Sequence, residues 1–385
     1  MSVRSLVTKR IRGFERPFDV LNRIEVSESA ILNNFDTYTN ILAGVAVFPV
    51  LKANAYGHGI AVVANILKKR MFPYLVVDGY FEALKIREVS DQAVLLLGYV
   101  DPANYRNMDL RNTAVVVHDS ETVKALGNLK RKVTVHVKVD TGMHRLGVYP
   151  DEVGGLVTEI MKYPTLKIEG IMSHLSSADG DDQTFTNDQM AKFRGAVGEV
   201  QTLVGEKLPY VHVGASSGSL KVPPGVANAA RIGLGLYGIQ PFNEKSSYAE
   251  KLAALRPALR LVSKIISVKE IKKGDKVSYS GTFVADRDMR IGILPLGYYE
   301  GIDWRLSNRG VVEVNGSYAR ILGRVCMNVV VIDLTDIDAG WMDEVVVIED
   351  EKDSRNSVEA ISKTCETIPY DILVHLNESV RRVVG

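Results

Sequence analysis

The sequence predicts a (β/α)₈ barrel of the TIM type followed by a C-terminal β-rich domain. Between about residues 45 and 235, eight short apolar runs rich in β-branched residues alternate with segments of helical period. These runs are apolar on both faces, which is typical of a parallel sheet covered by helices. After about Leu259 the period changes to two, which indicates antiparallel strands. An open, doubly wound sheet is the alternative for the first part.

The barrel elements follow one another in regular order along the chain. We predict strands at 45–51, 74–77, 94–97, 114–117, 133–139, 167–172, 210–213 and 229–232. Helical segments are predicted at 60–70, 81–89, 120–128, 152–161 and 188–204. We place the barrel at residues 15–255 and the β-rich domain at 256–385. Residues 1–14 form a basic extension that we expect to pack on the second domain, with a targeting role as the alternative.

The second domain is predicted to be all-β. Its strands are expected at 261–268, 277–283, 290–294, 311–314, 319–322, 329–334 and 345–348. Asn315 and Gly316 lie between two of these runs and predict a two-residue type I′ hairpin, because both central residues must take positive φ. Few classes of enzyme combine a barrel with a following β domain, so this order of domains limits the functions to be considered.

Composition excludes several classes of protein. The 385 residues carry 47 basic and 46 acidic side chains, so a polyanion such as nucleic acid is not an expected partner. The two cysteines, Cys326 and Cys365, have no zinc-ligand spacing, so no metal is expected and a reducing cytoplasm fits. No apolar run approaches the roughly 18 residues needed to span a bilayer.

Lys52 is the first candidate for chemistry, because it follows the first predicted strand. Barrel enzymes keep their active sites at the carboxyl ends of the strands. Partial burial there would lower the pKa of a lysine and make its amine a nucleophile, able to hold an aldehyde cofactor. A solvated lysine at a strand end is the alternative for an isolated residue of this type.

The residues around Lys52 carry a resemblance to a known family. Segment 52–59 reads KANAYGHG and resembles the pyridoxal-5′-phosphate (PLP) attachment motif of the alanine racemase family. Further segments match the family in the same order, over roughly residues 20–380: KVDTGMHRLG at 138–147, RIGLGLYG at 231–238, VSY at 277–279, GRVCMN at 323–328 and TIPY at 367–370. The resemblance implies a PLP-dependent isomerase that interconverts L-alanine and D-alanine and supplies D-alanine for peptidoglycan.

The resemblance also implies the catalytic groups. Lys52 would carry the cofactor and act as one acid/base group at Cα, and Tyr279 would be the other. Racemisation removes a proton from one face of a planar carbanion and delivers one to the opposite face, so two groups are required. Members of the family are homodimers, so the resemblance implies that Tyr279 and Met327 of one subunit close over Lys52 of the other.

Cofactor and substrate contacts follow from the same motifs. The implied phosphate contacts are Tyr56, Ser216, Gly233, Leu234 and Tyr370, at the place where barrels commonly bind phosphate. Arg231 would donate to the pyridine nitrogen without leaving a proton on it, and His174 would support Arg231. Arg145 and the main-chain amide of Met327 would bind the substrate carboxylate, and Lys138 aligns with a lysine that some relatives carbamylate.

Several alternatives remain open at the level of sequence. Ala215, Glu300 and Asn328 depart from the usual residues of the family, which bears on substrate preference. A racemase for serine, lysine or another amino acid is the closest alternative, because one methylene changes selectivity by only about 1–3 kcal/mol. A PLP-dependent decarboxylase is disfavoured by Arg231, and a noncatalytic PLP-binding protein by the presence of a β domain.

Overall fold

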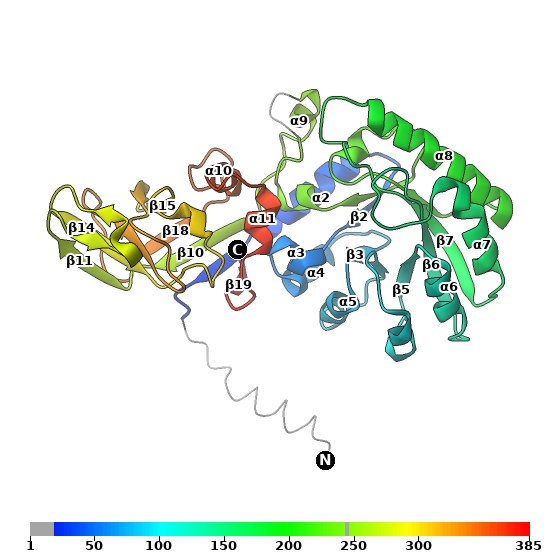
Figure 1. Cartoon of the computed structure of the whole chain (residues 1–385), viewed down its shortest axis with the longest axis horizontal. Helices are drawn as coiled ribbons and strands as arrows, with labels where there is room; N and C mark the ends of the chain where they lie inside the picture. The colour runs from blue at the N-terminus through cyan, green and yellow to red at the C-terminus, as the bar shows by residue number, and fades with distance from the viewer. Residues whose placement is uncertain (1–18, 243–245) are drawn as a thin grey trace, which may run out of the picture.

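The molecule has two parts that lie side by side, a barrel and a strand-rich part (Figure 1). This computed structural model describes residues 19–242 and 246–385. The basic extension predicted at residues 1–14 lies outside the described residues.

Eight parallel strands form the barrel, as the sequence predicts. They are hydrogen-bonded in the order β2-β9-β8-β7-β6-β5-β4-β3, and a parallel bridge between Val50 and Val76 joins the two ends of the sheet. Closure follows from strands that are buried on both faces, since β3, β4 and β5 contain buried residues alone. The strands are β2 (Ala46–Pro49), β3 (Leu75–Val77), β4 (Val94–Leu96), β5 (Thr113–Val117), β6 (Val133–Lys138), β7 (Leu166–Met172), β8 (Tyr210–His212) and β9 (Ala229–Ile232).

Helices surround the barrel, and the five predicted from the sequence are all present. A 3-10 helix at Pro102–Asn107 replaces an α-helix between β4 and β5. The short 3-10 segments Gly218–Leu220 and Leu234–Tyr237 follow β8 and β9. The α-helices of this part are α2 (Glu28–Ile41), α3 (Lys52–Tyr56), α4 (Ile60–Leu67), α5 (Tyr80–Arg87), α6 (Ser120–Gly127), α7 (Val153–Met161), α8 (Thr184–Val204) and α9 (Ser247–Lys251).

The strand-rich part contains three sheets. Six strands pair in the order β16-β15-β18-β10-β1-β19, three in the order β11-β14-β17, and β12 pairs with β13. Strand β1 (Arg23–Val26) precedes the barrel in sequence but pairs here with β10 and β19. The other strands are β10 (Leu259–Lys264), β11 (Ser267–Ile271), β12 (Lys276–Val277), β13 (Phe283–Val284), β14 (Met289–Leu294), β15 (Val311–Val314), β16 (Ser317–Arg320), β17 (Val330–Asp333), β18 (Glu344–Ile348) and β19 (Arg381–Val384).

Two strand predictions in this part are wrong. The run 261–268 is not one strand, because β10 and β11 pair with different sheets and the chain turns from one to the other between them. The run 277–283 is also interrupted: Ser278 and Ser280 take φ of 64° and 62°, which turns the chain at residues 279–281. Tyr279 therefore lies in a turn. The predicted Asn315-Gly316 hairpin is confirmed, with φ of 49° and 75°.

The expectation of an all-β second domain needs one correction. Helices α10 (Val358–Thr364) and α11 (Pro369–Val374) interrupt it, and α11 lies between the two parts (Figure 1). The Ser357 side chain caps α10 by accepting from Ala360 N, and Pro369 begins α11 at a position where its missing N–H costs nothing. Both helices have fewer than eight residues, too short for a helical period to stand out in the sequence.

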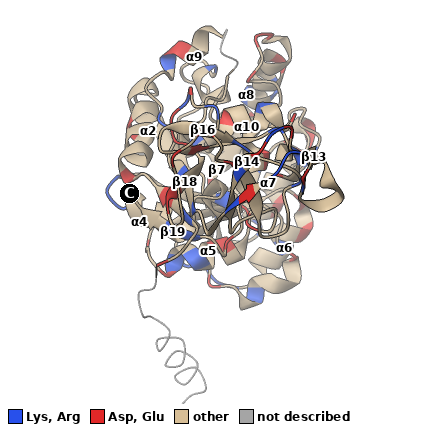
Figure 2. Cartoon of the chain, turned by 90° about the vertical axis from the view of Figure 1, so that its left-hand side faces the viewer, with Lys and Arg blue, Asp and Glu red and all other residues tan. Residues whose placement is uncertain are grey.

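The surface carries both signs of charge. Basic and acidic residues are interspersed over both parts of the ribbon in Figure 2, in agreement with the nearly neutral composition. Within residues 19–242 and 246–385, no helix combines the length and apolar character needed to cross a membrane. The same residues contain no cluster of three or more His, Cys, Asp or Glu side chains arranged to hold a metal ion.

Candidate active site

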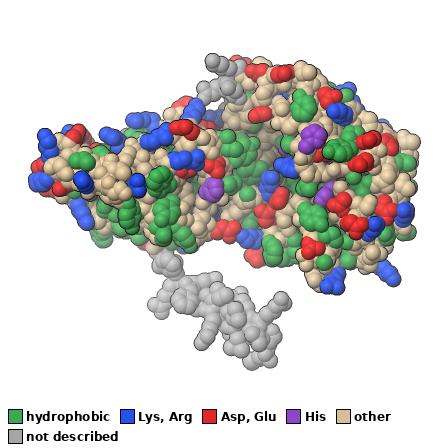
Figure 3. All heavy atoms as spheres, in the orientation of Figure 1, with side chains coloured by type: hydrophobic (Ala, Val, Ile, Leu, Met, Phe, Trp, Pro, Cys, Tyr) green, Lys and Arg blue, Asp and Glu red, His purple; other side chains and the backbone are tan. Residues whose placement is uncertain are grey.

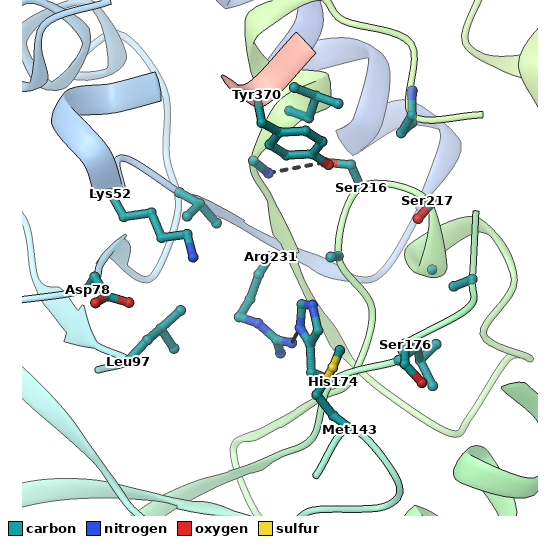
Figure 4. Close-up of a pocket in the computed structure, with 18 of the residues that line it drawn as sticks. Lys52, Asp78, Leu97, Met143, His174, Ser176, Ser216, Ser217, Arg231 and Tyr370 are labelled. Atoms are coloured by element: carbon teal, nitrogen blue, oxygen red, sulfur yellow. Dashed lines mark hydrogen bonds between the residues drawn. The ribbon is translucent and has the colours of Figure 1, made fainter. Parts of the chain in front are cut away.

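A cavity of about 720 Å³ opens at the carboxyl ends of the barrel strands (Figure 4). Residues after β2, β3 and β4 line one side of it, and residues after β7, β8 and β9 line the other. Ten residues named from the sequence line it together: Lys52, Tyr56, Lys138, Arg145, His174, Ser216, Arg231, Gly233, Leu234 and Tyr370. The barrel thus brings together segments up to 318 residues apart, from Lys52 to Tyr370.

Segment α3, which carries Lys52, is a left-handed turn and has no regular right-handed helical backbone. Ala53, Asn54 and Ala55 take φ of 53°, 53° and 54°, a conformation that costs roughly 1 kcal/mol or more per residue. Two side chains hold it, since Glu82 Oε1 accepts from Ala53 N at 2.6 Å and Asn54 Oδ1 accepts from Ile60 N at 2.9 Å. Backbone strain that neighbouring groups over-determine is typical of functional sites, and here it orients Lys52 toward the cavity (Figure 4).

A cradle for an oxyanion lies at the start of the segment after β9. The Ser216 hydroxyl oxygen accepts from Gly233 N at 3.1 Å and from Gly235 N at 3.2 Å (Figure 4). A Cβ atom on Gly233 would lie 2.5 Å from the Tyr56 hydroxyl oxygen, so only glycine allows this close approach. Tyr370 lies beside Tyr56, with ring centroids 5.9 Å apart. Hydroxyl and amide donors therefore converge where the phosphate contacts were predicted.

Arg231 is buried beneath the cavity and leaves one donor free. Its Nη1 donates to His212 Nδ1 at 2.8 Å and His212 O at 3.0 Å, and its Nη2 donates to Ser173 O at 2.8 Å and contacts His174 Nδ1 at 3.2 Å. Among the described residues no acceptor contacts its Nε–H. Burial lowers the pKa of Arg231 to about 10, so it stays a cation at pH 7. The site fits a ring nitrogen that accepts a hydrogen bond.

His174 is held neutral by its surroundings. Burial, followed by the charge of Arg231, lowers the pKa of His174 to about 3. A neutral imidazole can accept from Arg231 Nη2, whereas a protonated one would place a second positive charge against the guanidinium. His174 Nδ1 thus lies within hydrogen-bond distance of Arg231 Nη2, and its predicted role in supporting Arg231 stays a prediction.

Lys138 and Arg145 lie on opposite ends of one loop. Asp140 holds this loop, because its carboxylate accepts from the backbone N–H groups of Gly142, His144 and Arg145 at 2.8–3.0 Å. Burial lowers the pKa of Lys138 to about 8, and the charges of Arg145 and Arg231 act in the same direction. A substantial fraction of neutral amine is thus present near pH 8, the form that can react with carbon dioxide.

The charge of the cavity suits an anionic ligand. Four basic side chains line it, Lys52, Lys138, Arg145 and Arg231, against two acidic ones, Asp78 and Asp179. Sequence reasoning missed the two acidic residues and Tyr99. The rule that barrel sites lie after strands could have found Asp78 and Tyr99, since they follow β3 and β4. Asp179 lies in the longer loop between β7 and α8, where that rule singles out no one residue.

Tyr279 and Met327 are not part of this cavity. They lie in the strand-rich part and are 70% and 55% exposed. The Ser278 hydroxyl donates to Arg324 O at 2.7 Å, which holds the turn of Tyr279 beside the loop of Met327. One chain thus places these two residues near each other but outside the cavity that contains Lys52. Hydrophobic side chains gather on this part and in the hollow between it and the barrel (Figure 3).

Two of the unusual residues contact each other. Asn328 Nδ2 donates to Glu300 Oε1 at 2.8 Å, and Glu300 Oε2 accepts from Gly297 N at 2.7 Å. An amide facing a carboxylate forms a hydrogen bond, whereas two acids at this distance would repel each other. The pair ties the Gly297 turn to the loop of Met327, and Ala215 lies in the wall of the cavity next to Ser216.

Comparisons with known proteins agree on one family. Residues 26–241 match the family description "Alanine racemase, N-terminal domain" and residues 258–384 match "Alanine racemase, C-terminal domain". The alanine racemase of Halothermothrix orenii is 34% identical over 365 residues, which cover 93% of this chain and 95% of that protein. The structure of alanine racemase from Bacillus anthracis with bound L-Ala-P has a TM-score of 0.86 at 28% identity, covering 96% of each chain. The structure from Bartonella henselae with covalently bound pyridoxal phosphate has the same fold, with a TM-score of 0.83 at 23% identity, covering 95% of this chain and all of that one.

Proposed function

The chain belongs to the alanine racemase family and is an isomerase that racemises alanine with PLP, and we propose that Lys52 and Tyr279 are its two acid/base groups. The observation that carries this proposal is the convergence of Lys52, the Ser216 cradle and the free Nε–H of Arg231 in one cavity. These three groups fit the aldehyde, the phosphate and the ring nitrogen of PLP, respectively. When bound, PLP withdraws electron density from Cα of an attached amino acid, so that its proton becomes removable.

Different residues of the cavity would hold different parts of the cofactor. Tyr56, Ser216, Gly233, Leu234 and Tyr370 would bind the phosphate, and Lys52 Nζ would hold the aldehyde group. Arg231 would donate from Nε to the ring nitrogen. Because a guanidinium with a pKa of about 10 keeps its proton at pH 7, Arg231 would supply a hydrogen bond there without giving up a proton.

Two bases on opposite faces of Cα perform the racemisation. Lys52 Nζ exchanges a proton on one face and the hydroxyl oxygen of Tyr279 exchanges a proton on the other. Tyr279 and Met327 lie outside the cavity of their own chain, and we propose that a second copy of the chain supplies them. In this proposal the active enzyme is a homodimer with two shared sites, related by a twofold axis.

Arg145 and Met327 position the substrate carboxylate. Arg145 provides a charge-assisted donor, and the main-chain amide of Met327 approaches from the partner. A carbamate on Lys138 would turn this lysine into an anion and orient Arg145. The pKa of about 8 makes the neutral amine available for that modification.

The cellular role follows from the product. The enzyme works in the cytoplasm and supplies D-alanine for peptidoglycan. Serine, lysine or another amino acid is the second candidate substrate, because Ala215, Glu300 and Asn328 differ from the usual residues and the last two form the pair beside Met327.

A substrate panel tests the function. Purified protein loaded with PLP is incubated separately with L-alanine, L-serine and L-lysine, and the D-products are measured by chiral chromatography. The expected result is the highest kcat/KM for alanine. A higher value for another amino acid would change the substrate, and no D-product from any of them would refute the racemase activity.

A further inference from the structure

A chain of buried polar side chains runs from Arg231 toward the opposite end of the barrel. Arg231 Nη1 contacts His212 Nδ1 at 2.8 Å, and His212 Nε2 contacts His136 Nδ1 at 2.8 Å. His136 Nε2 then faces Glu169 Oε2 at 3.9 Å, a charge contact that is longer than a hydrogen bond. Both histidines are fully buried, and each lies on a different barrel strand. The chain thus links the cavity to a carboxylate at the far side of the barrel core.

Only one arrangement of protons satisfies these contacts. Arginine can only donate, so His212 Nδ1 must accept and carry no proton. A neutral His212 then carries its proton on Nε2 and donates it to His136 Nδ1. A neutral His136 in turn carries its proton on Nε2, which points to Glu169. Burial lowers the pKa of both histidines, in agreement with their neutral forms.

A bulge in β7 places Glu169 in this position. In β7 the register shifts so that Val135 faces Ile168 and His136 faces Gly170, which leaves Glu169 as the extra residue of a bulge. A Cβ on Gly170 would lie 2.5 Å from His136 Nδ1, so a glycine is needed for the imidazole to fit. Glu169 lies three residues before the end of β7, about 10 Å below the cavity.

Two further side chains hold the carboxylate. The Tyr74 hydroxyl donates to Glu169 Oε2, and Lys167 Nζ donates to Oε1 at 3.3 Å. The contact with His136 is the largest influence on Glu169 and lowers its pKa to about 2, although burial opposes this shift. Glu169 is therefore an anion at pH 7. No acid among the described residues forms an ion pair with Arg231, so the buried guanidinium meets a counter-charge only through the two imidazoles.

We propose that Glu169 is a positioning residue that acts on the cofactor ring through His136, His212 and Arg231. Arg231 sets the direction of the protons from one end of the chain, and the negative charge of Glu169, 3.9 Å from His136 Nε2, stabilises the same direction from the other end. The guanidinium is then held in one orientation, with Nε–H directed to the place of the ring nitrogen. This inference rests on the proposed function for the ring, and on two hydrogen bonds and one charge contact for the chain.

Histidine tautomers provide a readout that is independent of turnover. The protein contains seven histidines, so ¹⁵N-histidine labelling of the full chain gives few signals, and His136→Asn assigns the one from His136. In the wild type, with or without PLP, we expect His136 and His212 both to be protonated on Nε2. In Glu169→Leu the charge that favours a proton on His136 Nε2 is removed, so we expect the Nδ1-protonated tautomer of His136 to become populated beside it. We also expect the apparent dissociation constant for PLP to rise about tenfold, the lower end of losses when outer partners of a ligating group are removed.

Two variants complete the experiment. Glu169→Gln keeps the shape and an acceptor oxygen but removes the charge, so it should change both readouts in the same direction by less, and it replaces Glu169→Leu if that variant does not fold. Glu121→Gln is the control, because this exposed glutamate pairs with Lys124 on α6, away from the chain of buried side chains, and its loss should change neither readout. Unchanged tautomers, or changed tautomers with PLP affinity within twofold of wild type, would overturn the proposal. Failure of the wild type to racemise any amino acid would refute the proposed function and leave the tautomer result standing.

Discussion

Mixing two inactive variants should restore activity if the site is shared between two chains. Lys52→Ala removes the anchor and one base from the cavity, and Tyr279→Phe removes the proton carrier while keeping the ring. Tyr279 is 70% exposed and lies outside the cavity of its own chain, so its substitution leaves packing within the barrel unchanged. Each homodimer then lacks one essential group at both sites and should be nearly inactive.

The expected recovery follows from counting sites. A hybrid dimer joins the intact Lys52 of one chain to the intact Tyr279 of the other at one site and combines both lesions at the second. With equal amounts and random exchange about half of the dimers are hybrids, so about a quarter of wild-type activity should return if the two sites are independent. Chiral measurement of alanine turnover, after conditions that exchange subunits, provides the number.

A matched control separates this effect from a general loss of tyrosine hydroxyls. Tyr318 lies on β16, is 37% exposed and contacts Ser354 through its hydroxyl. Tyr318→Phe should keep full activity. If verified hybrids of the two inactive variants recover nothing, Lys52 and Tyr279 act in the same chain's site and the shared-site reasoning is wrong.

Four further predictions follow from the same cavity. Borohydride reduction of the loaded protein should fix PLP to Lys52, and peptide mapping that locates it on another lysine would refute the assignment. Gly233→Ala should weaken PLP binding at least tenfold in an absorbance titration, because its Cβ would lie 2.5 Å from the Tyr56 hydroxyl oxygen; unchanged binding would show that the cradle adapts. Carbamylation of Lys138, measured by ¹³C NMR with labelled bicarbonate, should increase as pH rises through about 8, since only the neutral amine reacts. A carbamate signal that persists in Lys138→Gln would show that the modification is on another residue. The free energy of unfolding should fall as pH decreases from about 6.5 toward 3, because His174 binds a proton there in the unfolded chain but not in the folded one, where its pKa is about 3. His174 alone contributes a slope of at most about 1.4 kcal/mol per pH unit. An unchanged slope in His174→Asn would exclude this contribution.

The barrel was predictable because its signal is local and repeated. Eight apolar runs each had to be a buried strand, and the structure confirms all eight with ends within two residues. The second domain was less predictable. A period of two persists through 261–268 and 277–283, but backbone turns at 265–266 and at Ser278–Ser280 divide both runs. The positive φ angles of these two serines could not be predicted from residue type, since glycine is the residue that usually indicates a positive φ. The domain boundary near residue 255 stays a prediction, and β1 shows that a strand before the barrel in sequence can pair within the other part.

The sequence by itself determined the family, the barrel and the identity of Lys52, Arg231 and Ser216 as candidates, because short motifs specify chemistry residue by residue. The tertiary structure alone decided which candidates meet. It placed ten of them around one cavity and left Tyr279 and Met327 exposed outside it, which is the reason to invoke a second chain. It also connected Arg231 to Glu169 through two histidines on separate strands. Such contacts depend on how strands are ordered and staggered around the barrel. No local pattern in the chain encodes the distance between side chains on separate strands.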